Sequence, residues 1–115
     1  MTAPVIDIAT FKGLQEAAGA DFVDDLVDTF LEEAPAMLSE LQRALAARDA
    51  EKFRRAAHSL KSNGNTFGAL GLGAMAKDLE LAGLARVLEK GAEPLAPLMG
   101  EYSRVAAALA KLRHA

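Results

Sequence analysis

Alanine and leucine dominate the sequence and set the strongest limit on what it can fold into. Together they fill 42 of 115 positions, whereas valine, isoleucine and threonine fill 11. Alanine and leucine lose little conformational freedom in a helix, while β-branched side chains are the ones that pack well on a pleated sheet. The sequence therefore predicts an all-α fold, because it has too little strand-forming material to build a sheet.

The length and composition predict one folded domain covering residues 1–115. With 51% hydrophobic and 25% charged positions, the chain has enough apolar material for a single core. There is no cysteine, which excludes disulfides, thiolate zinc sites and cysteine nucleophiles. The N-terminal residues lack the pattern of a signal peptide, and no uncharged stretch is long enough to span a membrane. We therefore expect a cytoplasmic protein that does not bind membranes.

Charge is unevenly distributed along the chain. Residues 1–40 contain nine acidic side chains and one basic one, whereas residues 41–115 contain seven acidic and twelve basic ones. This pattern fits either ordinary solvated helix faces or an acidic and a basic side that select a protein partner. A net charge of −3, no tryptophan and a single tyrosine argue against nucleic acid as that partner, because such interfaces need basic patches and stacking rings.

Capping residues and glycines divide the chain into five predicted helices. Asp7, Asp21 and Asp49 are predicted N-caps, because a carboxylate can accept hydrogen bonds from the free N–H groups of a first helical turn. The predicted ranges are 7–18, 21–47, 50–66, 71–89 and 93–113. Short connections make consecutive long helices antiparallel. We therefore predict an up-down antiparallel four-helix bundle, with the short first helix as a lid on one end.

Two prolines and a set of apolar residues shape the expectations for the long helices. Pro94 is predicted to lie in the first turn of the last helix, where its missing N–H costs no hydrogen bond. Pro35 is expected to bend the second helix near Leu31. Large apolar residues are predicted to form the buried face of that helix: Phe22, Leu26, Phe30, Leu31, Leu38, Leu41 and Leu45.

His58 is predicted to lie on the exposed side of the third helix. At about 100° per residue, the apolar side chains of that helix gather on a stripe that is about 140° away from His58. The stripe consists of Phe53, Ala57, Leu60, Gly64 and Phe67. The neighbours of His58 on the helix surface are polar and mostly basic, namely Arg54, Arg55, Lys61, Ser62 and Asn65. An exposed imidazole in such surroundings is available to react.

Glu80 is predicted to meet His58 from the following helix. The hairpin between the two helices is centred on Ala69, eleven residues after His58 and eleven before Glu80. Equal offsets bring the two positions to the same level in an antiparallel pair. A carboxylate bonded to Nδ1–H would fix one tautomer of the ring and leave Nε2 as a nucleophile. Lys61, one turn after His58, is placed to screen the charge of an incoming phosphoryl oxygen.

The sequence AHSLKSNGNTFGA at residues 57–69, followed at the usual distance by Leu79-Glu80, resembles a histidine-containing phosphotransfer (HPt) domain. The resemblance covers essentially the whole chain, since the acidic first half and the sequence FLEEAP at residues 30–35 are typical of bacterial members. In that family, the residue that matches His58 accepts a phosphoryl group from the aspartate of one receiver domain. It then passes the group to another receiver domain.

The resemblance also implies roles for residues around the histidine. Lys61 would assist the transfer, Gly68 would allow the turn, and Glu80 would orient the ring. One position departs from the common pattern, because Ser62 follows the lysine where glycine is frequent, and a small residue still fits there. Asn65 is bulkier than the residues usual at its position, which predicts a narrower set of accepted receivers.

These features predict a phosphoryl carrier that uses His58 and is not itself an enzyme. No ATP-binding loop is present, so no autokinase activity is expected. The expected partners are receiver domains of response regulators and of a hybrid histidine kinase, with the chain acting as a monomer. No metal site or cofactor is expected in the chain, since the receiver domain would supply Mg²⁺. The predicted partner-binding residues are Arg54, Arg55, Ala57, Ser62, Gly64, Asn65 and Gly68.

Of three other possible functions, one stays open and two are excluded. A helical adaptor that docks without phosphoryl chemistry is the alternative, and it would keep its activity as a His58→Gln variant. The dimerisation helices of a histidine kinase are excluded, because Ser59 stands where those kinases place an acidic residue. The sequence GLGAMA at residues 71–76 matches a dinucleotide-binding pattern but follows a predicted helix, whereas that motif requires a preceding strand.

Overall fold

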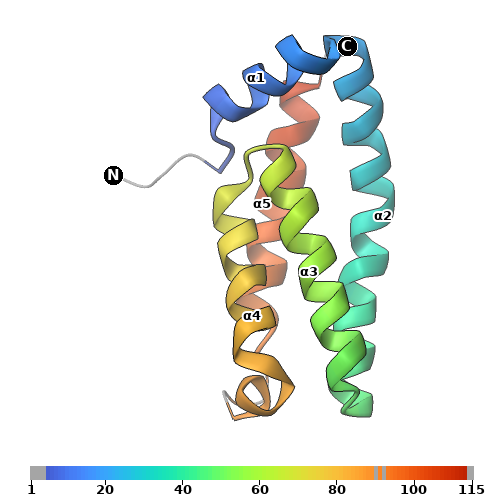
Figure 1. Cartoon of the computed structure of the whole chain (residues 1–115), viewed down its shortest axis with the longest axis vertical. Coiled ribbons are helices and arrows are strands. Elements are labelled where there is room, and N and C mark those ends of the chain that lie inside the picture. Colours follow the sequence, from blue (N-terminus) through green and yellow to red (C-terminus); the bar gives the residue numbers. More distant parts are fainter. Residues whose placement is uncertain (1–4, 90, 92, 114–115) are drawn as a thin grey trace.

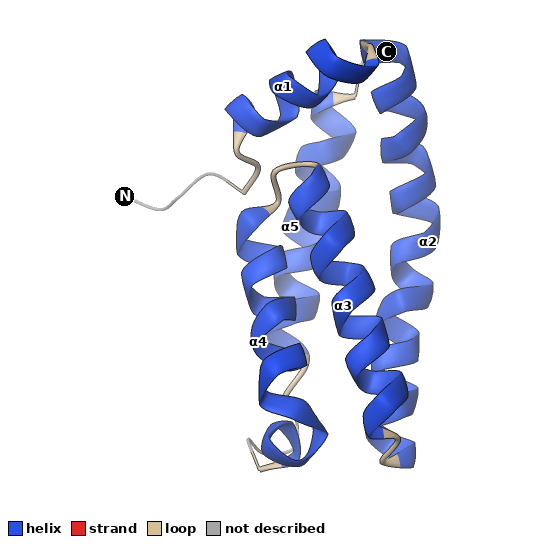
Figure 2. Ribbon diagram, in the orientation of Figure 1, coloured by secondary structure: helices blue, strands red, loops and turns tan. Residues whose placement is uncertain are grey.

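The computed structural model describes residues 5–89, 91 and 93–113, and helices make up most of them. The five helices are α1 (Ile8–Ala18), α2 (Ala20–Ala47), α3 (Ala50–Thr66), α4 (Leu70–Leu88) and α5 (Ala96–Leu112). Figure 2 shows them joined by short loops, with no strand among the described residues. The predicted all-α class is confirmed. None of the described helices is long and apolar enough to cross a membrane.

Four long helices lie alongside one another, and α1 crosses one end of the bundle (Figure 1). In that view α2 and α4 run downwards along the chain, whereas α3 and α5 run upwards. This is the predicted up-down bundle with a short additional N-terminal helix. The most extensive packing between helices joins α3 to α4, and the next joins α2 to α3. The hairpin of α3 and α4 is therefore the most closely associated pair of elements in the bundle.

Signals close to α3 in the sequence set its start and its rotation. The Asp49 side chain accepts a hydrogen bond from the N–H of Lys52 at 3.1 Å, which caps the first turn as predicted. Burying a large apolar side chain stabilises a fold by about 1.5–3 kcal/mol, so a continuous apolar stripe determines which face of a helix turns inwards. All five residues of the predicted stripe are buried, together with Ala56, which was not predicted: Phe53, Ala57, Leu60, Gly64 and the C-cap residue Phe67.

Helix α2 differs from the prediction at its start and on its buried face. Its N-cap is Gly19 and not Asp21, because the chain turns from α1 into α2 at this single glycine, which has a φ of 94°. Phe22 was predicted to be buried but is 55% exposed, since it lies about 100° around the helix from Val23 and Leu41 in the buried stripe. The helix runs unbroken through Pro35. The buried residues of α2 are Val23, Asp24, Val27, Phe30, Ala34, Leu38, Leu41 and Ala44.

The turn between α3 and α4 requires a glycine and anchors the start of α1. Gly68 has a φ of 84°, a conformation that residues with a Cβ rarely adopt. A Cβ at this position would also lie 2.7 Å from the carbonyl oxygen of Asp7. The N–H of Asp7 donates to the carbonyl oxygen of Gly68 at 2.8 Å, and the Asp7 side chain caps α1 by accepting from the N–H of Thr10. The lid helix is thus tied to the hairpin.

The second half of α4 and the start of α5 also differ from the prediction. Gly83 has a φ of 80° and a ψ of 164°, which interrupts the helical geometry of α4 near its end. The interruption changes the register, so that Leu84 is buried where an unbroken helix would present the glycine. α5 begins at Ala96 and carries Pro97 in its first turn, because residues 94 and 95 form the turn that leads into it.

Candidate functional site

His58 lies on the solvent side of α3, about midway along the helix. Its side chain is 53% exposed, while the preceding residue, Ala57, is fully buried. The buried stripe fixes the rotation of α3, and the helical arithmetic places the histidine well away from that stripe. The imidazole is therefore held at the surface by the packing of the opposite face of its helix, as predicted.

Glu80 reaches His58 from α4, at the level that the hairpin length predicts. The His58 Nδ1 and the Glu80 Oε2 atoms are 2.9 Å apart, which is a good hydrogen-bond distance. The Glu80 side chain is only 14% exposed, so most of it is covered by its own helix and its neighbours. The contact joins the two helices that pack most extensively, and it gives the exposed ring a fixed partner.

Lys61 completes this group by binding the second oxygen of the same carboxylate. Its Nζ atom donates to Glu80 Oε1 at 2.8 Å, and its side chain is 25% exposed. The hydrogen bond from Lys61 is the main cause that lowers the pKa of the Glu80 carboxyl, helped by the hydrogen bond with His58, although burial acts in the opposite direction. Glu80 is therefore an anion at neutral pH, with both of its oxygens occupied.

The charge of Glu80 determines the tautomer of the His58 ring. An ionised carboxylate can only accept hydrogen bonds, so the proton between the two groups must belong to Nδ1. In a neutral imidazole the other nitrogen then has a free lone pair. Nε2 is consequently the nucleophilic atom of His58. The arrangement can form a covalent bond at Nε2 while Glu80 stabilises positive charge on the ring.

A second carboxylate, Glu51, lies on α3 before the histidine. Its Oε1 atom accepts from Arg54 Nη2 at 2.7 Å and from Arg55 Nε at 3.1 Å. The hydrogen bond from Arg54 lowers the pKa of Glu51 most, followed by the hydrogen bond from Arg55. Both arginines were predicted as site residues, but their shared partner was not. The signal was present, since separations of three and four residues place side chains together on a helix.

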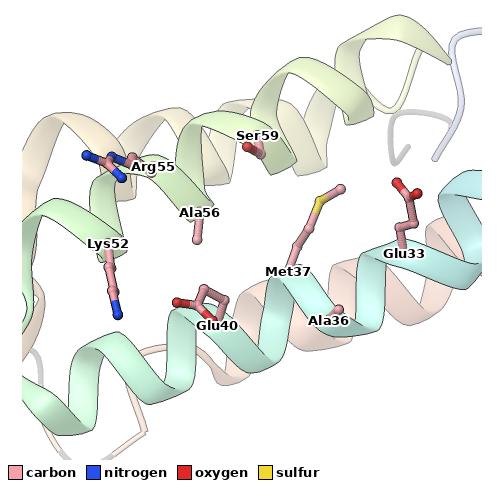
Figure 3. Close-up of a pocket in the computed structure, with 8 residues that line it drawn as sticks. All are labelled: Glu33, Ala36, Met37, Glu40, Lys52, Arg55, Ala56 and Ser59. Atoms are coloured by element: carbon pink, nitrogen blue, oxygen red, sulfur yellow. The ribbon is translucent and has the colours of Figure 1, made fainter.

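A groove runs between α2 and α3 beside the histidine (Figure 3). It has a volume of about 540 Å³, and Ser59, the residue after His58, forms part of its lining. Its acidic side chains come from α2 and its basic side chains from α3, with apolar residues between them. The lining residues are Glu33, Ala36, Met37, Glu40, Lys52, Arg55, Ala56 and Ser59. This groove was not predicted from the sequence, because its shape depends on how two helices diverge.

The predicted partner-binding residues divide into exposed and buried sets. Arg54, Arg55, Ser62 and Asn65 are exposed on α3. Ala57, Gly64 and Gly68 are buried, which corrects their prediction as contact residues. Ala57 belongs to the core stripe, and Gly64 faces the start of α4, where a Cβ would make ordinary contacts with Ala69 and Leu72. These three residues shape the hairpin and present no side chain to a partner.

Asn65 has a specific resting place against the neighbouring helix. A Cβ at Gly73 of α4 would overlap the side-chain oxygen of Asn65, so the missing side chain of this glycine makes room for the amide. This contact gives a structural reason for a glycine in the segment that resembled a dinucleotide motif.

The described residues contain no cluster of three or more side chains suited to a metal ion. The second histidine of the sequence, His114, lies outside the described residues. Glu80 contacts His58 and binds Lys61, while Arg54 and Arg55 bind Glu51 earlier on the same helix.

Comparisons with known proteins agree with this geometry. The model of the Hpt domain family matches residues 25–115. Among solved structures, the chain is similar to the crystal structure of histidine-containing phosphotransfer protein B (HptB) from Pseudomonas aeruginosa PAO1. The sequence identity is 30% and the TM-score 0.86, with 97% of this chain and 96% of that chain covered. A search of curated proteins gives no match.

Proposed function

This chain belongs to the Hpt domain family and has a histidine phosphotransfer function in phosphorelays, and from that premise we propose that His58 is the residue that carries the phosphoryl group. The observation that supports this assignment most is the 2.9 Å contact between Nδ1 of His58 and Oε2 of Glu80. In the neutral imidazole it leaves Nε2 as the nitrogen with the free lone pair, on a ring that is more than half exposed. A receiver domain can approach such a ring without any rearrangement of the core.

The proposed step is an attack by Nε2 on the phosphorus of an aspartyl phosphate. The Nε2–P bond forms while the bond between phosphorus and the aspartyl oxygen breaks, and the aspartate leaves as a carboxylate. The Nδ1 proton stays in place, so the ring becomes positively charged and Glu80 stabilises that charge. In onward transfer, an aspartate carboxylate of a second receiver attacks the phosphorus, and Nε2 leaves with its electron pair.

We assign Glu80 and Lys61 to the positioning of the ring. Glu80 holds the tautomer, and Lys61 holds Glu80 through its second oxygen. A carboxylate fixed at both oxygens cannot rotate away from the imidazole without losing a charge-assisted hydrogen bond. The ring therefore meets the phosphorus in one orientation, and such preorganisation lowers the cost of reaching the transition state.

The proposed partners are receiver domains of response regulators and of a hybrid histidine kinase, which this chain meets as a monomer. Arg54 and Arg55 supply positive charge near His58, and Ser62 and Asn65 continue the same exposed side of α3. The groove between α2 and α3 adds apolar area next to them. A basic surface around the nucleophile complements the acidic site of a receiver and accelerates encounter at low salt.

The chain is proposed to act in the cytoplasm as a carrier without catalytic activity of its own. The receiver is expected to bring Mg²⁺ and most of the groups that stabilise the transferring phosphoryl group. The present chain then needs only a positioned nucleophile, which agrees with the small size of the site. Proximity within the complex supplies much of the remaining rate.

The proposal is tested by transfer from a panel of phosphorylated receiver domains to the parent protein and to a His58→Gln variant. We expect acid-labile label on the parent and none on the variant. His114→Gln is the matched control, since it removes the only other imidazole of the sequence and should keep the label.

Two outcomes would contradict the assignment. Label on His58→Gln but not on His114→Gln would move the carrier role to the other histidine. Absence of label from every receiver, with receiver binding and the helical fold intact, would favour the non-catalytic adaptor. Biological activity that survives in His58→Gln would point to the same alternative.

A further inference from the structure

Two basic side chains flank His58 on α3, one turn before it and one turn after it. Arg54 lies four residues before the histidine and Lys61 three residues after it, so both lie within reach of the same stretch of helix surface. Both are bound to carboxylates in this structure. The two pairs differ in how firmly each cation is held. That difference determines which cation can leave its carboxylate and bind a phosphoryl group.

Lys61 is held in a largely covered arrangement. Its partner Glu80 is 14% exposed, comes from another helix and is also bonded to His58. Moving Lys61 away would leave a poorly solvated carboxylate with one of its two hydrogen bonds missing, which is unfavourable. Lys61 is therefore committed to Glu80 in the resting protein.

Arg54 is held in a way that is easily exchanged. Its pair with Glu51 lies within one helix, and the two side chains are 51% and 55% exposed. Exposed pairs of this kind contribute little to stability, because water and salt compete for both charges. Glu51 also keeps a second hydrogen bond, from Arg55, so it is not left without a partner when Arg54 moves.

Arg54 and Arg55 lie toward different neighbours of α3. Arg55 lines the groove between α2 and α3. The pKa of the Arg54 guanidinium is raised chiefly by its hydrogen bond with Glu51, and the charge of Glu80 on α4 adds to this. Arg54 is therefore within electrostatic reach of the carboxylate that holds the His58 ring.

We propose that Arg54 exchanges Glu51 for the phosphoryl group once His58 is phosphorylated, so that Glu51 acts as its resting partner. This inference rests on the proposed function of His58. A guanidinium offers two parallel N–H donors that match two phosphoryl oxygens, and a doubly negative group attracts it more strongly than a carboxylate does. The contact would withdraw the charge that drives loss of the phosphoryl group to water, and so lengthen the life of phosphohistidine.

The experiment loads His58 chemically, so that no receiver domain is needed. In a His114→Gln background, phosphoramidate phosphorylates the imidazole: the Nε2–P bond forms, the P–N bond of the reagent breaks and ammonia leaves. The readouts are the ³¹P chemical shift of the phosphohistidine and the rate of its hydrolysis. The variants are Arg54→Gln, Arg55→Gln and Arg54→Lys. Arg104→Gln is the matched control, since Arg104 forms the same three-residue pair with Glu101 on α5.

We expect Arg54→Gln to shorten the phosphohistidine lifetime by about two- to five-fold at low salt, the size that an exposed charged contact supports. It should also shift the ³¹P resonance, whereas Arg104→Gln should change neither. Arg54→Lys should restore part of the lifetime because it retains the charge. The effect of Arg54→Gln should shrink as salt rises.

Glu51→Gln tests the pair of Arg54 and Glu51 by removing the carboxylate in place of the guanidinium. Removal of this carboxylate should lengthen the lifetime, and the gain should persist in Glu51→Gln/Arg55→Gln but disappear in Glu51→Gln/Arg54→Gln. Equal lifetimes and equal ³¹P shifts for Arg54→Gln and Arg55→Gln would overturn the proposal. That outcome would leave the carrier role of His58 intact, because the carrier role is judged separately by label from receiver domains.

Discussion

Two carboxylates near His58 each accept hydrogen bonds from two basic side chains, and yet they are built very differently. Glu80 binds Lys61 and the histidine ring, joins α4 to α3, and is 14% exposed. Glu51 binds Arg54 and Arg55, which lie on its own helix, and is 55% exposed.

The difference between the two carboxylates shows that the number of hydrogen bonds does not indicate what a charged group does. A carboxylate that is covered and links two helices fixes the geometry of its partners, because water cannot replace the bonds. A carboxylate in water on a single helix holds its partners only until a stronger anion arrives. The surface around His58 therefore contains one carboxylate that positions the ring, Glu80, and one whose bound cations can be exchanged, Glu51.

The largest expected effect comes from removing Glu80. Glu80→Ala should lower the rate of phosphoryl transfer to His58 by about 10- to 100-fold, the range found when a group that orients an imidazole is removed. Glu51→Ala should change that rate by only about two- to three-fold, because it loosens charge without freeing the ring. Stopped-flow transfer from one phosphorylated receiver measures both, with circular dichroism as a check of the helical fold. Equal rates for the two variants would remove the distinction.

A smaller effect is expected when the cations are removed one at a time. Lys61→Gln should raise the pKa of Glu80, because the Lys61 hydrogen bond is the main cause of its lowering. It should also slow transfer about three- to ten-fold, less than loss of Glu80 itself, since the contact with Nδ1 persists. Arg54→Gln should raise the pKa of Glu51 less completely, because Arg55 still donates to it. Carbon-13 NMR titration of the two carboxyls gives both values, and an unshifted Glu80 would contradict the assigned cause.

The smallest effect concerns stability at acid pH. Glu80 and Glu51 both have a pKa below the usual value of 4.5, so the stability that each contributes is present above that value. It is lost as the pH falls through the lowered pKa of the folded state. The difference in unfolding free energy between the parent and Glu80→Gln should therefore shrink as the pH falls below the usual carboxyl value of 4.5.

Added salt should affect the stability contributions of Glu51 and Glu80 differently, whereas acid pH affects both in the same direction. In urea unfolding at neutral pH, about 1 M salt should abolish the difference between the parent and Glu51→Gln. The difference between the parent and Glu80→Gln should largely persist, because its charges are covered. If high salt also abolished the difference in stability between the parent and Glu80→Gln, the two carboxylates would be alike.

The contact between His58 and Glu80 could be predicted because it depends on short distances along the chain. The periodicity of α3 gave the direction of His58, and the length of the hairpin gave the level of Glu80. The cap at Asp49 and the turn at Gly68 are likewise set by neighbouring residues. These are local rules, and tertiary packing did not override them.

The parts that could not be predicted depend on choices between helices or on competing local signals. Gly83 sits in a sequence that continues to favour a helix, and only the burial of Leu84 shows why the helix is interrupted there. Phe22 was favoured by its size, although the core selects the row that begins at Val23. The groove depends on how two helices diverge, so no local signal could have suggested it. The sharing of Glu51 could have been suggested by its separations of three and four residues from Arg54 and Arg55.

The turn at Gly68 has a consequence for the changes of chain length that this chemistry tolerates. His58, Lys61 and Glu80 all lie within residues 58–80, so a gain or loss of one residue inside that interval would rotate one partner by about 100° and shift it by about 1.5 Å. Insertions elsewhere in the bundle leave this register untouched. Keeping the reacting geometry thus means keeping the number of residues between His58 and Glu80, whatever the lengths of the other connections.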